Sequence, residues 1–307
     1  MKISVVIVTF NGMKWIEDCV ESILKSTLMP EIIIVDNCST DNTLAFLKNN
    51  YSQKIRLIES EENLGFGGAN NIGISLALQQ NSDFVFLLNQ DTIIEKDTLE
   101  KLLEVSINNP DFGIISPIHS DGKGSQLDIS FLYYINRHSS DLISDSILNN
   151  KLKEIYPVEM INAAAWFLPK KTFEIVGGFD PIFFLYGEDD NFCQRVLYHN
   201  LKIGITPRTV INHDSDNNYS FTFPAGSEKY YKKFLNRIKV KYGDVNSDDY
   251  KKIDKMRMHF LKKAVVSLFK LNFKNYQINK TKYNLIDKKS IMASVFKNRE
   301  VGKKYLV

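Results

Sequence analysis

The chain has 307 residues, of which 44% are apolar and 24% charged, and its formal net charge is +3. This composition excludes disordered and collagen-like proteins, and the length suffices for one large domain plus an appendage. Cys19, Cys38 and Cys193 form no CxxC pair, so the sequence indicates neither a disulfide framework nor a zinc site. No apolar run approaches the ~20 residues that span a bilayer, so we expect a cytoplasmic chain.

The charge is unevenly distributed along the chain. Residues 226–307 contain 22 Lys and Arg against 7 Asp and Glu, whereas residues 1–225 contain 17 against 29. We therefore expect two differently built regions, divided between residues 225 and 226.

Strand and helix patterns alternate through the first part of the chain. The expected strands are 3–8, 32–36, 55–58, 84–88 and 113–116. The expected helices are 16–24, 44–47, 70–80 and 98–107, with a Gly-rich loop before the third. Long apolar strands separated by helices predict an α/β fold, in which helices flank a mostly parallel central sheet.

Polar residues collect where these strands end. The first strand runs into TFNG at 9–12, the second ends at Asp36, and the fourth runs into NQD at 89–91. Ligands of parallel sheets bind outside the carboxyl ends of the strands, which predicts a binding site at this edge. The Gly-rich segment 63–73 lacks the last glycine of GxGxxG, which disfavours a dinucleotide-binding enzyme. We expect its glycines to let the backbone approach a ligand closely.

Five segments together resemble a known family. They are VVIVTFN, IVDNCSTDNT, ENLGFGGANNIGI, FLLNQDT and VGGFDPIFFLYGEDDNFCQR. Their order and spacing are similar to those of family 2 glycosyltransferases with the GT-A fold, and most similar to the rhamnosyltransferase-like branch of bacterial surface polysaccharide synthesis. The resemblance covers residues 2–215. It implies a catalytic domain at 1–225, with a nucleotide-sugar part at about 1–116 and an acceptor and catalytic part at about 117–225. The charge asymmetry separates from this domain a basic helical region at 226–307.

The resemblance also assigns residues to the sugar donor. Asp36 matches the aspartate that contacts the nucleoside base, and Asn70 and Asn71 match a loop that closes over the nucleoside. The implied donor-binding set is Thr9, Asn11, Asp36, Gly67, Asn70, Asn71 and Gln90.

A divalent cation is implied at the end of the fourth strand. Asp91 matches the last acid of the DxD motif, which holds Mg²⁺ or Mn²⁺ against the diphosphate, and His213 matches a histidine that completes such a site. A hard cation with oxygen ligands lowers the cost of charge on the leaving diphosphate. Asn89 stands where the motif usually has its first acid, which leaves one carboxylate in place of two.

Three adjacent acids occur in GEDDNFC at 187–193. Asp189 matches the catalytic base of the family, Glu188 matches its neighbour, and Asn191 replaces the second aspartate of the usual EDxD motif. The alternative is a solvated helix start, since acids favour helix N-termini. Trp166 and Phe184 would either line the acceptor side or pack in the core.

The resulting hypothesis is an inverting transfer from dTDP-rhamnose or a UDP-hexose to a glycan or lipid-linked glycan, with no nucleic-acid partner. Asp189 would take the proton of the acceptor hydroxyl in a single displacement. Two alternatives stay open. A sugar nucleotidyltransferase should carry a GxGxR-like loop after the first strand, which TFNGMKW lacks, and a non-catalytic scaffold would tolerate loss of the acids, which are present.

The C-terminal region carries an apolar stripe flanked by lysines. The stripe is Leu261, Ala264, Val265 and Leu268, and Lys262, Lys263 and Lys270 flank it. A basic amphipathic helix predicts peripheral contact with the inner face of the cell membrane. The alternative is packing on the protein's own core or on another subunit of a homo-oligomer.

Overall fold

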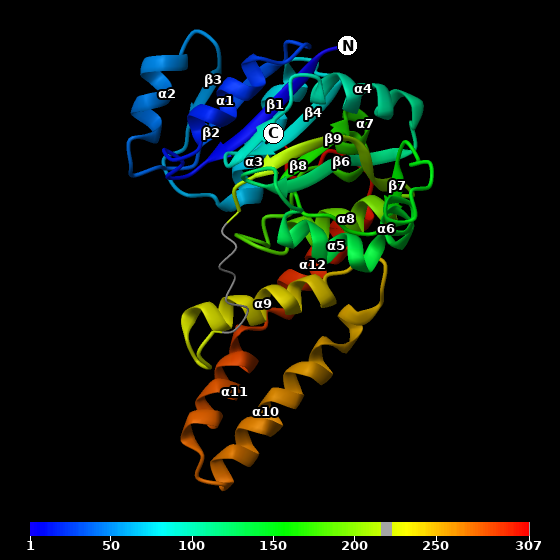
Figure 1. Cartoon of the computed structure of the whole chain (residues 1–307). Coiled ribbons are helices and arrows are strands. Elements are labelled where there is room, and N and C mark those ends of the chain that lie inside the picture. Colours follow the sequence, from blue (N-terminus) through cyan, green and yellow to red (C-terminus); the bar gives the residue numbers. More distant parts are fainter. Residues whose placement is uncertain (216–222, 307) are drawn as a thin grey trace. The chain divides into compact units, whose positions relative to one another are not determined.

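The computed structural model describes residues 1–215 and 223–306 (Figure 1). The chain divides into two compact units, Met1–Asn217 with Val301–Val307, and Asn218–Glu300. The sequence prediction assigned the whole of 226–307 to the C-terminal region. In the structure, residues 301–306 belong instead with the first unit.

The first unit is built on one mixed sheet in the order β3-β2-β1-β4-β8-β6-β9-β5, with β7 paired to β9. The strands are β1 (Ile3–Thr9), β2 (Glu31–Asp36), β3 (Arg56–Glu59), β4 (Phe84–Asn89), β5 (Thr92–Ile94), β6 (Phe112–Asp121), β7 (Tyr156–Val158), β8 (Ala165–Pro169) and β9 (Lys202–His213). Strands β1 to β4 are parallel, β8 is antiparallel to β4 and β6, and β6 and β9 are parallel to each other.

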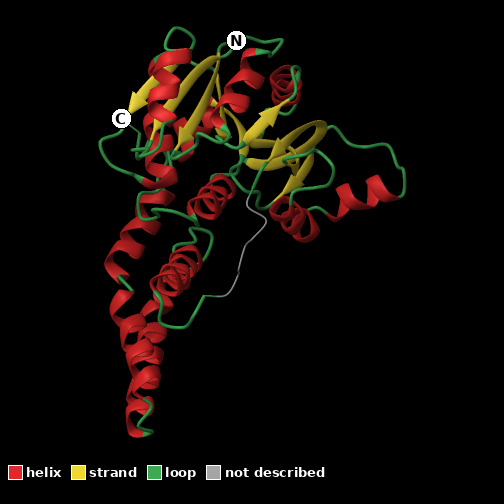
Figure 2. Ribbon diagram, turned by 60° about the vertical axis from the view of Figure 1, so that its left-hand side comes forward, coloured by secondary structure: helices red, strands yellow, loops and turns green. Residues whose placement is uncertain are grey.

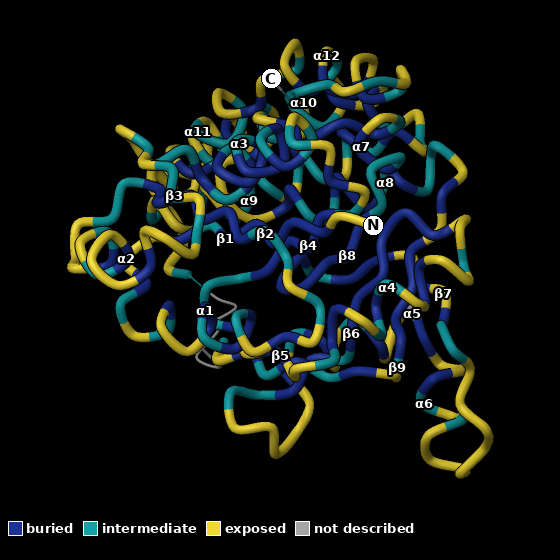
Figure 3. Tube along the Cα trace, turned by 90° about the horizontal axis from the view of Figure 1, so that it is seen from above, coloured by how far each residue is buried: buried dark blue, intermediate teal, exposed yellow. Residues whose placement is uncertain are grey.

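Helices cover both faces of this sheet, as Figure 1 shows. They are α1 (Ile16–Leu24), α2 (Thr43–Tyr51), α3 (Gly65–Gln79), α4 (Thr98–Asn108), α5 (Ile129–His138), α6 (Ser140–Ile147), α7 (Lys170–Val176) and α8 (Glu188–Tyr198). Val6 packs in the core under α3, α5, α7 and α8, whereas Val5 and Ile7 pack in the core under α1 and α4. Figure 3 shows the central strands buried. Burial on both faces explains the continuous apolar runs.

Two predicted boundaries were wrong. Helix α3 begins at Gly65, so the segment expected to be a loop forms its first turns. Close packing explains these glycines, because a Cβ atom on Gly67 would lie 2.8 Å from the Cβ of Phe179. Strand β6 continues to Asp121, beyond the predicted end at residue 116, because it pairs with β9 along its length.

The second unit is helical. It contains α9 (Glu228–Tyr242), a 3₁₀ turn (Asp249–Lys252), α10 (Ile253–Phe269), α11 (Phe273–Leu285) and α12 (Lys288–Arg299). Side chains of Ser227, Asn272 and Asp287 accept bonds from the first-turn amides of α9, α11 and α12. Helices α10 and α11 lie side by side as an antiparallel hairpin (Figure 2). Among the described helices, none has the length and apolarity to cross a membrane.

Candidate active site

The predicted strand-end residues meet at one edge of the sheet. Thr9 pairs with Asp36 across β1 and β2, and Val8 pairs with Asn89 across β1 and β4. Asp36 is 1% exposed. Its Oδ2 accepts a bond from the Ser39 amide at 3.0 Å, while its Oδ1 has no hydrogen-bond partner in the described chain. A buried acceptor without a partner is costly, so this oxygen is suited to a ligand that donates a hydrogen bond.

Gln90 and Asn11 use their amide groups to hold the ends of β1 and β4. The Oε1 of Gln90 accepts bonds from the Thr9 hydroxyl at 2.6 Å and the Phe10 amide at 3.0 Å. The Oδ1 of Asn11 accepts a bond from the Thr40 amide at 2.8 Å. Asn11 itself is in the left-handed region at φ 50. These contacts organise the loops that border the edge.

The resemblance matched Asn70 and Asn71 to a loop, whereas both residues lie in α3. Both are buried in α3, and the Nδ2 of Asn70 donates to the Phe66 carbonyl at 3.0 Å. Asn71 makes two bonds to the backbone of Phe179, one from its Nδ2 to the carbonyl at 2.8 Å and one from the amide to its Oδ1 at 2.7 Å. Asn71 therefore anchors the segment that leads to the acid cluster.

The metal candidates Asp91 and His213 are neighbours. The Nε2 of His213 lies 3.4 Å from the Oδ1 of Asp91, and its Nδ1 lies 3.5 Å from the Oδ2 of Asp128. Burial alone would lower the pKa of His213, but the contacts with Asp128 and Asp91 raise it to about 9. Burial raises the pKa of Asp128, but bonds from His213, Ser215 and the Phe131 amide lower it overall.

Asp128 was missed from the sequence. It is 1% exposed and caps α5, where its Oδ1 accepts a bond from the Phe131 amide at 2.8 Å. An aspartate just before a helix is common as a cap, so the sequence carried no signal that this one faces His213. Orienting carboxylates of this kind often accompany a metal-binding histidine.

The residues present fit a divalent cation in part. Within the described ranges, no cluster of three or more His, Cys, Asp or Glu side chains could hold a metal. Asp91 and His213 would supply two ligands to one ion, because their Oδ1 and Nε2 atoms lie 3.4 Å apart. The remaining ligands would come from diphosphate oxygens and water, as is common for Mg²⁺.

The three acids lie in the first turn of α8, after Gly187, which is left-handed at φ 99. Glu188 is 5% exposed, and burial followed by the charge of Asp189 raises its pKa to about 8. Burial and the charge of Asp189 raise the pKa of Asp190 to about 7, and burial raises that of Asp189. A solvated helix start does not fit an acid buried to this degree.

The first turn of α3 joins the sheet edge to this acid cluster. The Asn37 side chain donates to the Gly65 carbonyl at 3.3 Å, and the Phe66 amide donates to the Phe184 carbonyl at 3.2 Å. A Cβ atom on Gly67 would lie 3.7 Å from the Cβ of Glu188. The predicted donor-binding edge and the predicted catalytic acids thus border the same glycine-rich turn.

A buried arginine links α8 to the backbone that follows α7. The guanidinium of Arg195 donates to Asn191 at 3.0 Å and to the carbonyls of Val176 at 3.0 Å and Gly178 at 2.7 Å. Burial lowers its pKa to about 10. The Gly178 amide also donates to the Lys304 carbonyl at 2.8 Å, so the chain's last residues brace the same turn. Asn191, which departs from the EDxD motif, orients this arginine.

Trp166 and Phe184 have different environments. Trp166 is fully buried and stacks on Phe179 with ring centroids 6.1 Å apart, so it packs in the core. Phe184 is 57% exposed.

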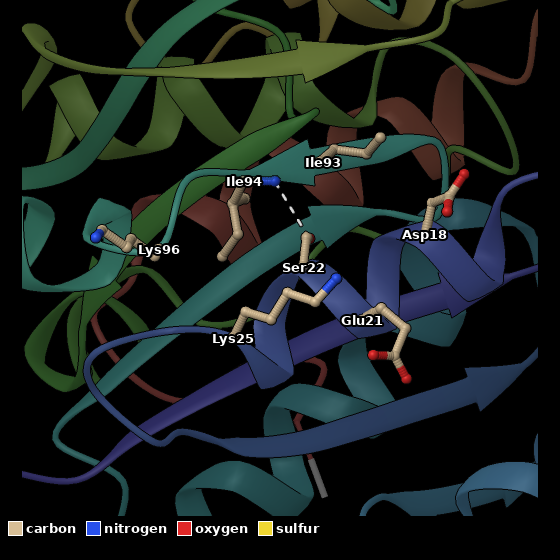
Figure 4. A pocket seen from close by; sticks show the side chains of 7 residues that line it. All are labelled: Asp18, Glu21, Ser22, Lys25, Ile93, Ile94 and Lys96. Atoms are coloured by element: carbon tan, nitrogen blue, oxygen red, sulfur yellow. Dashed lines mark hydrogen bonds between the residues drawn. The ribbon is translucent and has the colours of Figure 1, made fainter.

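A shallow pocket of about 260 Å³ lies between α1 and β5 (Figure 4). Its lining residues are Asp18, Glu21, Ser22, Lys25, Ile93, Ile94 and Lys96. None of the predicted site residues lines it, so it is separate from the strand-end edge.

Comparison with known proteins relates part of the first unit to a known family. Residues 4–153 match the family model described as Glycosyl transferase family 2. The chain is 26% identical to the low-salt glycan biosynthesis hexosyltransferase Agl10 of Haloferax volcanii over 203 residues, which are 66% of this chain and 64% of that protein. The chain therefore spans less than two thirds of this relative's length.

Two solved structures have the same fold. S. aureus TarS 1–349 in complex with UDP aligns with a TM-score of 0.53 and 17% identity over 92% of this chain and 91% of TarS. GalNAc-T7 with UDP, GalNAc and Mn²⁺ aligns with a TM-score of 0.56 and 16% identity over 78% of this chain and 48% of that one. The predicted GT-A fold is confirmed by these structures, and residues 4–153 are similar to glycosyl transferase family 2.

Proposed function

We propose that this chain is an inverting glycosyltransferase, which moves a sugar from a nucleoside diphosphate to a hydroxyl of a glycan or lipid-linked glycan. The observation that carries the proposal is the buried acid cluster of α8, joined through the first turn of α3 to the strand ends that hold Asp36. In this proposal, the base and the nucleotide-binding edge both border this one short turn. The family match of residues 4–153 supports it.

Asp189 acts as the base in this proposal. Burial raises its pKa toward the working pH, which suits a group that must accept a proton from a hydroxyl. Burial and the charge of Asp189 raise the pKa of Glu188 to about 8, so Glu188 keeps its own proton at neutral pH. The hydroxyl attacks the anomeric carbon as the bond to the diphosphate breaks, and no covalent enzyme intermediate is needed. A divalent cation at Asp91 and His213, when bound, would stabilise the leaving diphosphate.

Replacing Asp189 with Asn tests the proposal. Turnover should fall by about 10² or more, since base catalysis contributes 10² to 10⁴. The affinity for the free nucleoside diphosphate, measured by calorimetry, should stay the same. Asp190→Asn is the matched control and should cost less than tenfold. Wild-type turnover in Asp189→Asn, or the larger loss in Asp190→Asn, would contradict the assignment.

For the sugar donor we propose two candidates, a uridine nucleotide sugar and dTDP-rhamnose. The TarS structure contains UDP, which supports a uridine nucleotide, whereas the resemblance to the rhamnosyltransferase-like branch favours dTDP-rhamnose. Thermal shifts against a panel of nucleotide sugars would separate the two, because each ligand stabilises the folded state according to its affinity. For a lipid-linked acceptor, we also propose that the second unit contacts the membrane surface.

A further inference from the structure

The end of the α10–α11 hairpin exposes a group of large apolar side chains. Phe269 is 83% exposed, Leu271 is 75% and Phe273 is 61%. Of the stripe predicted from the sequence, Ala264 is buried, whereas Val265 and Leu268 are each 43% exposed. The most exposed apolar side chains of this hairpin therefore lie at its end. We call Phe269, Leu271 and Phe273 the hairpin end.

Leu271 occupies a backbone position that normally belongs to glycine. It follows the last turn of α10 at φ 53, in the left-handed region. The Leu271 amide bonds to the Leu268 carbonyl at 2.9 Å, and the Asn272 amide bonds to the Ser267 carbonyl at 2.9 Å. Helices that end this way usually carry Gly, because a Cβ atom is strained there. The backbone of Leu271 is strained, and its side chain packs against little of the fold because it is 75% exposed. Stability of the fold therefore does not explain a leucine at this position.

The hairpin is strongly basic. Residues 255–286 contain eight Lys and Arg and no Asp or Glu. Six of the lysines are exposed and have no acidic partner among the residues that the structure describes: Lys255, Lys262, Lys263, Lys270, Lys274 and Lys280. Lys282 differs, because it bonds to the Tyr230 hydroxyl at 2.6 Å inside the helical unit.

We propose that the hairpin end inserts into the interface of an anionic lipid bilayer, with Lys270 and Lys274 among the head groups. Apolar side chains projecting from a strongly basic element match the two parts of such a surface, the acyl boundary and the negative head groups. A nucleic acid offers charge but no apolar layer for Leu271 and Phe269. Only the biological purpose of membrane insertion rests on the proposed function: insertion would bring the active site to a lipid-linked acceptor.

Vesicle flotation of the full chain tests the proposal without sugar donor or acceptor, so its result does not depend on glycosyl transfer. Vesicles of phosphatidylcholine alone are compared with vesicles containing phosphatidylglycerol. Binding should require phosphatidylglycerol and weaken at least tenfold as salt rises to about 1 M, where charges more than ~3 Å apart are screened. Absence of binding at low salt, or equal binding to the neutral vesicles, would overturn the proposal.

Leu271→Gly is the most informative variant. It removes the apolar side chain and supplies the residue that the left-handed position favours, so the melting temperature should stay equal or rise. Binding to phosphatidylglycerol vesicles should weaken about tenfold, as expected for the loss of a leucine side chain from an apolar layer. Phe269→Ser should act in the same direction. Met29→Ser, which changes another apolar residue at 75% exposure, should leave binding unchanged.

Unchanged vesicle binding in Leu271→Gly and Phe269→Ser would refute insertion. Sedimentation of the wild-type chain supplies the other decisive result. A concentration-dependent dimer that dissociates in Leu271→Gly would assign the hairpin end to a second copy of the chain in place of lipid.

Discussion

Replacing Glu188 with Gln should stabilise the folded protein at neutral pH. Glu188 is 5% exposed, and its Oε2 has no hydrogen-bond partner in the described chain. Burial and the charge of Asp189 raise its pKa from 4.5 to about 8. Between these two values the folded state holds a proton that the unfolded state releases, so stability falls as pH rises.

The size of the effect follows from the width of that pH window. At about 1.4 kcal/mol per pH unit, the wild-type acid lowers the free energy of unfolding by about 3 kcal/mol at pH 7. Gln resembles the protonated acid in shape and has no charge to bury, so this loss should disappear. The two proteins should then have similar stability near pH 4.5 and diverge progressively up to pH 8.

Urea unfolding at several pH values between 4.5 and 8 measures this divergence. Glu62→Gln, at an exposed carboxylate, serves as the control and should track the wild type at every pH. A Glu188→Gln curve parallel to the wild type across the window would show that Glu188 is ionised in the folded state.

Three further predictions concern the metal, the glycine turn and the buried arginine. Calorimetry of UDP with Mg²⁺, Mn²⁺ or EDTA should show at least about tenfold tighter binding with metal, lost in Asp91→Asn, and equal affinity in all three conditions would favour a metal-free site. Gly67→Ala should lower the free energy of unfolding by about 2 kcal/mol, as overpacking does, because of the 2.8 Å approach to Phe179. Gly68→Ala, whose nearest neighbour would be the Leu64 Cβ at 3.1 Å, should stay within about 1 kcal/mol of wild type, and a larger loss there than in Gly67→Ala would contradict the packing argument. Arg195→Met should cost about 3 kcal/mol in urea unfolding, because it leaves the Val176 and Gly178 carbonyls without their donor, and a neutral result would exclude the arginine as the brace of this turn.

The parallel half of the sheet was predictable because both of its faces are covered. Val6 packs on one side and Ile7 on the other, so the strand shows an unbroken apolar run. In the other half of the sheet, which mixes parallel and antiparallel pairs, only the first residues of β6 gave such a signal. Strand β9 contains Pro207 and polar residues, and its pairing with β6 shifts register between Pro117 and Ile118. A strand interrupted in this way has neither a continuous nor an alternating pattern.

The candidate site was predictable to the extent that sheet topology determines it. Strand ends of a parallel sheet share an edge, and this rule alone brings Thr9 beside Asp36. The approach of Asp128 to His213 depends on chain segments 85 residues apart, which no local pattern encodes. The glycine-rich segment was interpreted as a loop because glycine has low helix propensity. Packing against Phe179 overrides that propensity and makes the segment helical.

The glycine-rich turn links two parts of the proposed chemistry that are far apart in sequence. Its Gly65 carbonyl is held by Asn37, next to the buried Asp36, and its Phe66 amide holds the Phe184 carbonyl, three residues before Gly187. A sugar donor that binds at the sheet edge and displaces this turn would also displace the start of α8, where Asp189 lies. The bonds of Asn71 to Phe179 and of Arg195 to Gly178 oppose such movement from the other side. The position of the base therefore depends on residues that need not touch either substrate.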